Sequence, residues 1–136
     1  MAFLHGSNAF IQVDDSGGTP TDISAYVTSV DGFPGDVASH DVTTFGKDTI
    51  ARAAGLKDTK ITLNGVHDPT CEAVLAGALG IVGTVTYGPA GSTAGMQKYT
   101  GEFLLTSFKL SSPVGGMITW TANYEIASGN LSDTTF

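Results

Sequence analysis

Apolar and polar residues alternate along several short stretches of this chain, and a period of two residues is typical of β-strands with one buried face. The clearest stretch is residues 117–127. Its apolar positions are Ile118, Trp120, Ala122, Tyr124 and Ile126, and its polar positions are Thr119, Thr121, Asn123 and Glu125. Similar stretches predict strands at residues 9–14, 22–30, 36–45, 56–65, 84–87 and 99–110, the last with Leu104, Phe108 and Leu110 on one face. The pattern therefore predicts a mainly β fold.

One α-helix is expected to interrupt the strands. Asp68 is a good N-cap, Pro69 suits the first helical position, and Glu72 lies near the positive end of the helix dipole. We expect this helix to run to about Leu79 and to stop at Gly80. Its expected apolar face consists of Val74, Leu75, Ala78 and Leu79.

The composition leads to the hypothesis that much of the surface is covered by copies of the same chain rather than by solvent. A length of 136 residues is typical of one domain, which we place at residues 1–136. Only 14% of the residues are charged, against an average of about 25%, and 18 are glycine. Low charge and many glycines indicate short strands, tight turns and a surface on which copies of the same chain pack.

The charge balance argues against capture of nucleic acid. The formal net charge is −7, and the chain has six lysines and arginines in all. A protein that binds DNA or RNA electrostatically needs a basic face that displaces counterions from phosphates. An acidic wall that DNA passes without sticking remains compatible with this balance.

Neither export nor membrane insertion is indicated. Residues 1–10 lack the basic and apolar regions of a signal peptide, and the most apolar run, residues 73–85, is too short and too rich in glycine to span a bilayer. The single cysteine, Cys71, leaves no disulfide within the chain. We therefore expect a protein that is made and stays soluble in a cytoplasm. Residues 1–8 and 128–136 show no periodicity and are expected to be flexible arms.

One tripeptide has the residue types of a catalytic triad. Ser39, His40 and Asp41 are consecutive in a predicted strand. Successive side chains of a strand point to opposite faces, so His40 points away from both neighbours. It can neither take a proton from Ser39 nor be oriented by Asp41, and the sequence predicts no catalytic residue.

Metal and phosphate sites are not predicted either. His67 and Cys71 are four residues apart, but no further ligand accompanies them, and a buried cysteine more often packs as a small apolar group. The acids at residues 14–15 lack the spacing of a calcium loop. The dipeptide Gly46-Lys47 lacks the other residues of a phosphate-binding loop. We expect no cofactor and no metal.

The most unusual segment is a long loop between two strands in the middle of the chain, residues 46–55. It combines the charged residues Lys47, Asp48 and Arg52 with the apolar Ile50. Alone, such a loop buries too little apolar area to offset the cost of ordering its backbone, roughly 1–2 kcal/mol per residue. We expect another subunit to fix it, with Ile50 in an apolar pocket and Arg52 beside an acidic group. A loop folded back on its own subunit is the alternative.

The segment around this loop resembles the tail tube proteins of long-tailed bacteriophages. The matching pieces are Thr43-Thr44-Phe45-Gly46, Gly55-Leu56-Lys57-Asp58, Thr62-Leu63-Asn64-Gly65 and, before the last strand, Ser111-Ser112-Pro113-Val114-Gly115-Gly116. The resemblance extends over about residues 10–127. It implies a mainly β protein with a β-sandwich or barrel-type tail tube fold and one short flanking α-helix.

The resemblance also implies an assembly. Six subunits would form a ring through a continuous inner β-barrel, and rings would stack into a tube whose lumen conducts DNA without binding it specifically. The protein would be part of the virion tail, assembled in the host cytoplasm, with a tape measure and a terminator protein at the tube ends. Lys47, Asp48, Ile50 and Arg52 would make contacts between subunits. From strand parity we expect the lumen to be lined by Thr62, Asn64, Thr119, Thr121, Asn123 and Glu125.

Several alternatives stay open at this point. The chain is also compatible with a tail terminator, a head decoration protein, or the inner tube of a contractile injection system. A small hydrolase would need a nucleophile and base pair, which is not found. A carbohydrate-binding sandwich would usually expose aromatic residues, whereas Trp120 and Tyr124 fall on the apolar face.

Overall fold

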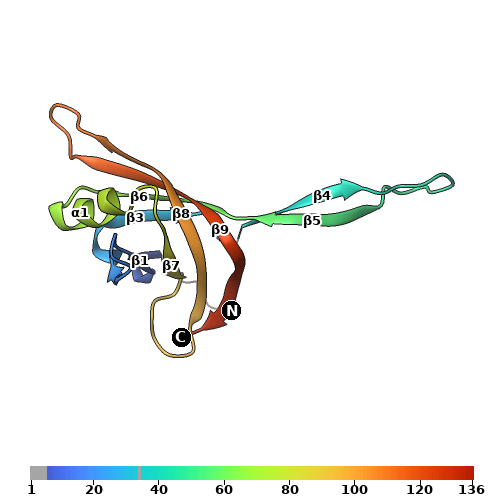
Figure 1. Cartoon of the computed structure of the whole chain (residues 1–136), viewed down its shortest axis with the longest axis horizontal. Coiled ribbons are helices and arrows are strands. Elements are labelled where there is room, and N and C mark those ends of the chain that lie inside the picture. The colour runs from blue at the N-terminus through green and yellow to red at the C-terminus, as the bar shows by residue number, and fades with distance from the viewer. Residues whose placement is uncertain (1–5, 34) are drawn as a thin grey trace.

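A computed structural model describes residues 6–33 and 35–136 and shows a β-rich body from which a two-stranded arm projects (Figure 1). The body is one antiparallel sheet with the strand order β2-β1-β7-β8-β9-β6-β3. Its strands are β1 (Phe10–Asp14), β2 (Pro20–Asp22), β3 (Val27–Asp31), β6 (Lys60–Val66), β7 (Val82–Gly88), β8 (Gln97–Ser111) and β9 (Thr119–Thr135). The arm consists of β4 (Asp36–Asp41) and β5 (Arg52–Asp58), and the helix is α1 (Pro69–Ala78). The predicted mainly β fold with one short helix is confirmed.

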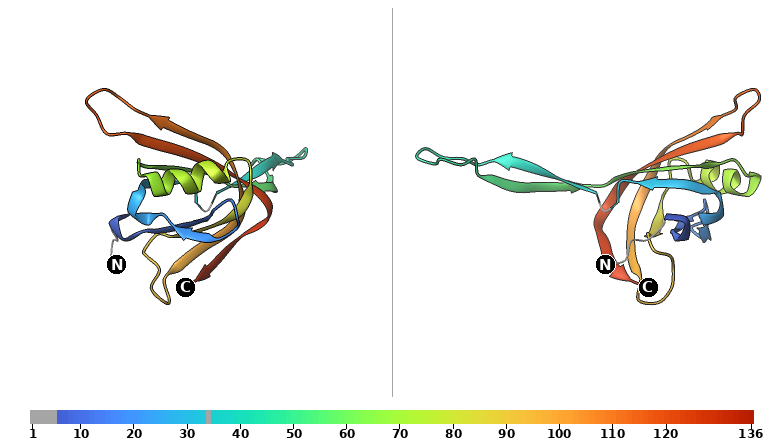
Figure 2. Two further views of the ribbon diagram at one scale, coloured as in Figure 1. Left: turned by 60° about the vertical axis from the view of Figure 1, so that its left-hand side comes forward. Right: turned by 180° about the vertical axis from the view of Figure 1, so that it is seen from behind.

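The sheet curls until its two edges approach each other. The edge strands β2 and β3 follow each other in the chain with only residues 23–26 between them, which include the short 3-10 turn η2 (Ser24–Tyr26). Ile23 is buried, and its backbone N–H donates a hydrogen bond to the carbonyl oxygen of Ile11 on β1, at 3.1 Å. The result is a barrel-like body with α1 packed at one end (Figure 2).

The predicted alternation is confirmed within the neighbouring strands β6 and β9, although Ile118, expected on the same apolar face, precedes β9 and is exposed. Ile61 and Leu63 on β6 and Trp120, Ala122 and Tyr124 on β9 are buried in the core. Their cross-strand partners follow from the antiparallel register, which pairs Ile61 with Tyr124 and Leu63 with Ala122. Side chains that face each other across two strands in this way are the unit of sheet stability.

A close approach fixes one glycine beside this core. Gly65 lies opposite Trp120, and a Cβ there would collide with the indole ring and with the carbonyl oxygen of Tyr26. Only glycine lets the ring lie against the strand. The indole N–H then donates a hydrogen bond to the carbonyl oxygen of Val66, at 3.0 Å.

The helix begins as predicted. The Asp68 carboxylate accepts a hydrogen bond from the backbone N–H of Thr70, at 2.9 Å, and Pro69 is the first helical residue. The chain leaves the helix through Gly80, which has a φ of 80°. The expected burial of Leu79 is wrong: the residue lies one position past the helix end and is exposed. The buried helical residues are Cys71, Leu75 and Ala78.

Two strand predictions are corrected by local irregularities. The expected strand at residues 22–30 is two strands interrupted by η2. In β8, an irregularity in the pairing between Leu105 and Ser107 reverses the alternation. Leu104 therefore lies on the opposite face from Phe108, and Phe103 and Leu105 are the buried residues.

The expected flexible C-terminal arm, residues 128–136, is wrong. Strand β9 continues to Thr135, and its last residues pair with the beginning of β8, from Thr100↔Ser132 to Gln97↔Thr135. The Phe136 ring packs edge-on against Phe10, with ring centroids 5.7 Å apart. Backbone pairing, which does not depend on apolar periodicity, orders this polar segment. Of the expected N-terminal arm, Gly6–Asn8 form a 3-10 turn and residues 1–5 lie outside the described part.

Within residues 6–33 and 35–136, no helix has both the length and the apolar character needed to cross a membrane.

Candidate assembly surfaces

The arm formed by β4 and β5 is held at its base and surrounded by solvent beyond it. In the described residues, both strands pair only with each other, and every residue of the arm strands is exposed except the partly buried Gly55. At the base, Gly32 and Gly35 have φ values of 108° and 113°. A Cβ at either glycine would collide with residues 59–61 of the neighbouring chain segment. These two turns therefore fix the point at which the arm leaves the body.

An aromatic cluster anchors the same base to the body. Phe33 stacks on Tyr87, with ring centroids 5.0 Å apart, and lies 6.1 Å from the ring of Tyr99. It also meets the buried Phe103 edge-on at 5.8 Å. These ring contacts, made by three partly buried residues and the buried Phe103, attach the base of the arm to the body.

The tip of the arm is a loop closed by Thr43. The Thr43 backbone N–H donates to the Asp41 carboxylate at 2.9 Å, and hydrogen bonds from the Thr43 hydroxyl and backbone N–H lower the pKa of Asp41. Ala51 donates its N–H to the Thr43 hydroxyl at 2.8 Å and accepts from the Val42 N–H at 2.9 Å. The loop predicted at residues 46–55 is therefore shifted to residues 42–51, because β4 ends at Asp41 and β5 already begins at Arg52.

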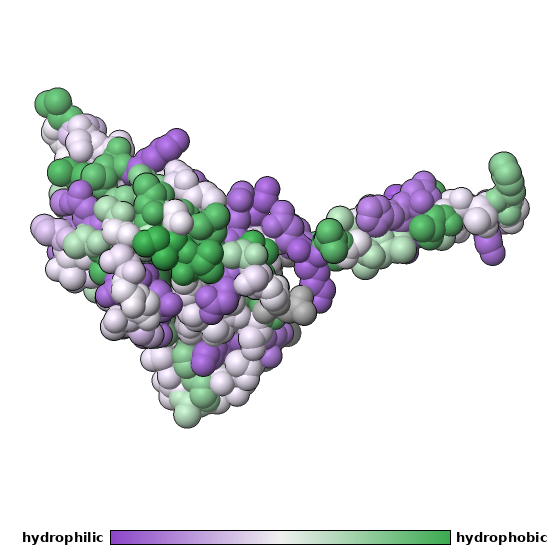
Figure 3. Space-filling model, in the orientation of Figure 1, coloured by the Kyte–Doolittle hydropathy of each residue, from purple (hydrophilic) through white to green (hydrophobic). Residues whose placement is uncertain are grey.

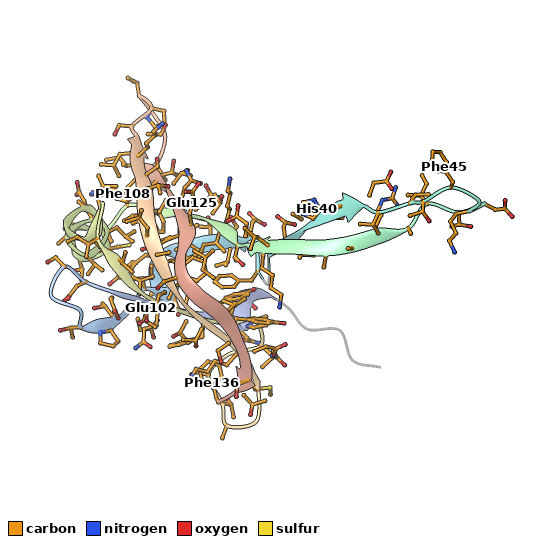
Figure 4. The ribbon with its side chains drawn as sticks, turned by 45° about the vertical axis from the view of Figure 1, so that its right-hand side comes forward. His40, Phe45, Glu102, Phe108, Glu125 and Phe136 are labelled. Carbon is orange, nitrogen blue, oxygen red and sulfur yellow. The ribbon has the colours of Figure 1, made fainter. Side chains whose placement is uncertain are left out.

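Apolar side chains are exposed along the whole arm, where apolar and hydrophilic residues lie side by side (Figure 3). Phe45 at the tip is fully exposed and points into solvent (Figure 4). The other large apolar residues exposed there are Val37, Val42, Ile50 and Leu56. The sequence prediction named Ile50 and missed Phe45. A single exposed apolar residue is common, but five of them on one hairpin indicate an interaction surface.

The four residues expected to contact another subunit do not form one cluster. Lys47, Asp48 and Ile50 lie in the tip loop, whereas Arg52 lies in β5, opposite Asp41 in the ladder. All four are exposed. Their contact with a second subunit stays a prediction.

The six residues expected to line a lumen lie together on the face of the sheet opposite the core. They occupy alternate positions of β6 and β9, and the register places Thr62 opposite Asn123 and Asn64 opposite Thr121. The Thr62 hydroxyl donates to the Asn123 side-chain oxygen at 3.0 Å, and the Thr121 hydroxyl donates to that of Asn64 at 2.9 Å. We call this surface the polar face; its members are Thr62, Asn64, Thr119, Thr121, Asn123 and Glu125.

Further groups extend the polar face across the sheet. Ser29 on β3 accepts a hydrogen bond from the Asn64 amide at 3.0 Å. Lys60 lies 3.9 Å from Glu125, and Lys109 on β8 is the cross-strand partner of Thr121. Ser29 and Lys109 were not predicted, because their place on this face depends on strand order and on the irregularity in β8.

The hairpin between β8 and β9 is a second exposed apolar tip. Val114 is fully exposed, and Met117 is 71% exposed. In Figure 1 this tip and the arm extend from the body in different directions. The sequence prediction assigned no role to this tip.

The serine, histidine and cysteine residues weighed in the sequence analysis lie on separate elements of the structure. Ser39, His40 and Asp41 follow one another along the exposed β4, as the strand prediction required. His67 pairs with Glu72, with 2.7 Å between Nε2 and Oε2. Cys71 is fully buried, and burial raises the pKa of its thiol to about 11. In the described part of the chain, no three His, Cys, Asp or Glu side chains are placed to share a metal ion.

Comparisons with solved structures identify the fold. The tail of an empty gene transfer agent particle, refined with C6 symmetry, matches with a TM-score of 0.76 and 19% identity, over 98% of this chain and 100% of that chain. The SPP1 tail tube matches with a TM-score of 0.64 and 9% identity, over 98% and 80%. The sheath/tube terminator of the PVC extracellular contractile injection system matches with a TM-score of 0.69 and 13% identity, over 99% of both chains.

A scan against models of protein families and a search of curated proteins gave no match. At these low identities the structural matches establish the fold alone. The chain has the tail tube fold, and the resemblance read from the sequence is confirmed at that level.

Proposed function

We propose that this protein is a structural subunit of a phage-like tail tube: it forms hexameric rings that stack into a tube through which DNA is delivered. The single observation that carries this is the projecting arm on a body with the tail tube fold. The protein acts by self-assembly and performs no catalysis. Its place is the virion tail, assembled in the host cytoplasm, with a tape measure and a terminator protein at the tube ends.

The arm supports assembly because contacts within its own subunit contribute little to its stability. An isolated two-stranded hairpin is marginally stable in water, and the strands of this one have no buried residue. Burial of one Phe side chain is worth about 1.5–3 kcal/mol. Contact with a second subunit would supply this energy through Phe45 and Ile50, with Lys47, Asp48 and Arg52 making polar contacts.

The sheet edge supports ring formation. In the described residues, β3 is an edge strand of five residues whose outer side has no strand partner. Unpaired edge groups are a template for pairing with another chain. Pairing of this edge with a neighbouring subunit would continue the sheet around a ring, and the C6 symmetry of the gene transfer agent tail suggests six copies.

The polar face supports a water-filled lumen. The Thr62 and Thr121 hydroxyls and the Asn64 amide already donate hydrogen bonds within the face, so these groups have fewer donors to offer to phosphate groups. Lys60 and Lys109 accompany Glu125, which makes the face mixed in charge rather than the acidic wall expected from the net charge. In this proposal DNA adheres weakly because most groups of the face are neutral and hydrogen-bonded within the protein.

Electron microscopy of the purified protein over a range of concentration and salt tests the proposal. We expect rings or tubes with a central channel, formed alone or with other tail proteins. A protein that stays monomeric under all these conditions and never enters tubes with tail partners would refute it.

A second candidate, a tube terminator or the inner tube of a contractile injection system, is favoured by the match to the PVC terminator. A terminator would cap pre-formed tubes and would not polymerise. An inner tube of that kind would bind a contractile sheath. Co-assembly with sheath protein and the length distribution of the polymers distinguish these cases.

A further inference from the structure

We infer that one row of side chains on β8 contacts the phosphate groups of DNA in the channel. The row consists of Ser107, Lys109 and Ser111, and we call it the donor row. This inference rests on the proposed function, in which the polar face lines the channel, and it names the groups to which passing DNA adheres.

The donor row reaches the polar face because of the irregularity in β8. Its members are the cross-strand partners of three polar-face residues on β9, in the pairs Ser107↔Asn123, Lys109↔Thr121 and Ser111↔Thr119. Phe108, between them, points to the core, where its ring centroid lies 6.0 Å from that of Trp120. Without the irregularity that precedes Ser107, the parity of β8 would be reversed and Lys109 would face the core. The irregularity therefore redirects a cation to the polar face.

The donor row differs from the rest of the polar face in its hydrogen bonding. The Thr62 and Thr121 hydroxyls donate to the side chains of Asn123 and Asn64. Within residues 6–33 and 35–136, by contrast, the side chains of the donor row form no hydrogen bond and no ion pair. The row therefore has two hydroxyl groups and one ammonium group to offer to a ligand.

Among the described residues of this surface, Lys109 is also the cation without a balancing carboxylate. Lys60, the other lysine there, lies 3.8 Å from Asp58 and 3.9 Å from Glu125, so two carboxylates balance its charge. The Lys109 side chain is exposed and no carboxylate in the described part of the chain pairs with it. Attraction for an anion is therefore concentrated at Lys109, because the groups around it are neutral.

The chemistry and the length of the donor row fit a run of phosphates. Lysine and serine side chains are common partners of DNA phosphate oxygens, and such contacts carry no sequence information. At roughly 3.3 Å per residue, the first and last members of the row are about 13 Å apart along the strand. One DNA strand carries a phosphate about every 3.4 Å of helix axis, so the row can meet more than one phosphate.

A neighbouring copy of the chain is the competing partner. In the described residues, β8 has no strand partner beyond Leu104 on the side of β7, so another subunit can approach there. The edge strand β3 ends in Asp31, which is its one acidic residue. That edge brings a single carboxylate to three donors, whereas a run of phosphates brings several acceptor oxygens. We therefore assign the donor row to DNA.

DNA binding by assembled tubes tests the donor row. A fluorescent linear duplex is sedimented with the tubes over a range of salt concentrations. A closed circular plasmid, which has no end to enter a channel, reports binding to the outer surface. Lys109→Gln removes the cation and Lys109→Arg keeps it. Lys98→Gln is the matched control, because it makes the same charge change at the other end of β8, where Lys98 lies 5.4 Å from the Phe136 ring centroid.

We expect the linear duplex to bind weakly to wild-type tubes and to be released as the salt concentration rises. Lys109→Gln should lower the affinity at low salt by at least about tenfold and flatten the salt dependence, because fewer counterions are released from phosphates. Lys109→Arg and Lys98→Gln should bind like the wild-type protein. Ser107→Ala with Ser111→Ala should lower the affinity but keep the salt dependence, since hydroxyl groups neutralise no phosphate.

Three outcomes would contradict the inference. Linear DNA bound equally by wild-type and Lys109→Gln tubes, or plasmid bound as well as linear DNA, would overturn the donor row and leave the proposed function standing. A large rise in the critical concentration for tube formation by Lys109→Gln, with unchanged DNA binding per tube, would assign Lys109 to a contact between copies instead. Failure of the wild-type protein to form tubes would overturn both the donor row and the proposed function.

Discussion

Replacement of Phe45 by Asp separates the stability of the subunit from the stability of the polymer. Phe45 is fully exposed in the isolated chain, and surface substitutions usually change the free energy of unfolding by no more than about 0.5 kcal/mol. The melting temperature of the free subunit should therefore change by no more than about 2 °C. Ile50→Asp, at a position that is 56% exposed, should behave in the same way.

The same substitution should strongly weaken the association of subunits in the polymer. Loss of the burial of one Phe ring between subunits removes about 1.5–3 kcal/mol per contact, which corresponds to a roughly 10- to 100-fold weaker association. An unpaired carboxylate in a dry contact adds a further cost. We expect the critical concentration for tube formation to rise by at least about tenfold.

Two measurements and one control variant separate an effect on subunit stability from an effect on assembly. Calorimetry of dilute, unassembled protein gives the melting temperature, and sedimentation of concentrated protein gives the critical concentration. Leu63→Ala is the control, because Leu63 is fully buried and its truncation should cost about 2–5 kcal/mol and roughly 6–20 °C in the free subunit. The reasoning is refuted if Phe45→Asp melts as early as Leu63→Ala, or if it polymerises like the wild-type protein.

Three further outcomes are expected. Deletion of residues 130–136 should lower the melting temperature of the free subunit, because it removes part of the pairing with β8 and the contact between Phe136 and Phe10. An unchanged melting temperature would show that these contacts do not stabilise the subunit. Burial raises the pKa of the Cys71 thiol to about 11 from 9.0. The un-ionised thiol therefore contributes about 2–3 kcal/mol to the free energy of unfolding, fully below pH 9, and this contribution is lost as the pH rises through 11. The free energy of unfolding of Cys71→Ala, measured as a function of pH, should fall less on the alkaline side than that of the wild-type protein. Glu125→Lys should leave the fold intact but make assembled tubes bind double-stranded DNA at low salt, measurable by co-sedimentation; equal DNA binding by both tubes would place Glu125 outside the channel.

The sequence by itself determined the features that depend on near neighbours in the chain. The alternation in residues 117–127 correctly assigns the buried face of β9, because side chains of a strand point to opposite sides wherever the strand lies. The start of α1 follows from Asp68 and Pro69, since capping uses groups only two residues apart. The same parity gathers the polar face on one side of β6 and β9.

Only the tertiary structure decided features that depend on distant partners. The polar residues 128–135 form a strand because β8 supplies hydrogen bonds from residues 97–102, a pairing that leaves no periodic trace in the sequence. The irregularity between Leu105 and Ser107 reverses the faces of β8, since one extra residue shifts every later side chain by one position.

The position of the arm is also a tertiary property. Strand β4 lies within the predicted strand at residues 36–45, whereas β5 begins inside the predicted loop, and the chain separates both strands from the body by Gly35 at one end and Thr59 at the other. Whether Phe45 is buried or exposed depends on the direction in which this base points the hairpin. That direction is set by the packing of Phe33 on Tyr87 and Phe103, three residues brought together by the curl of the sheet.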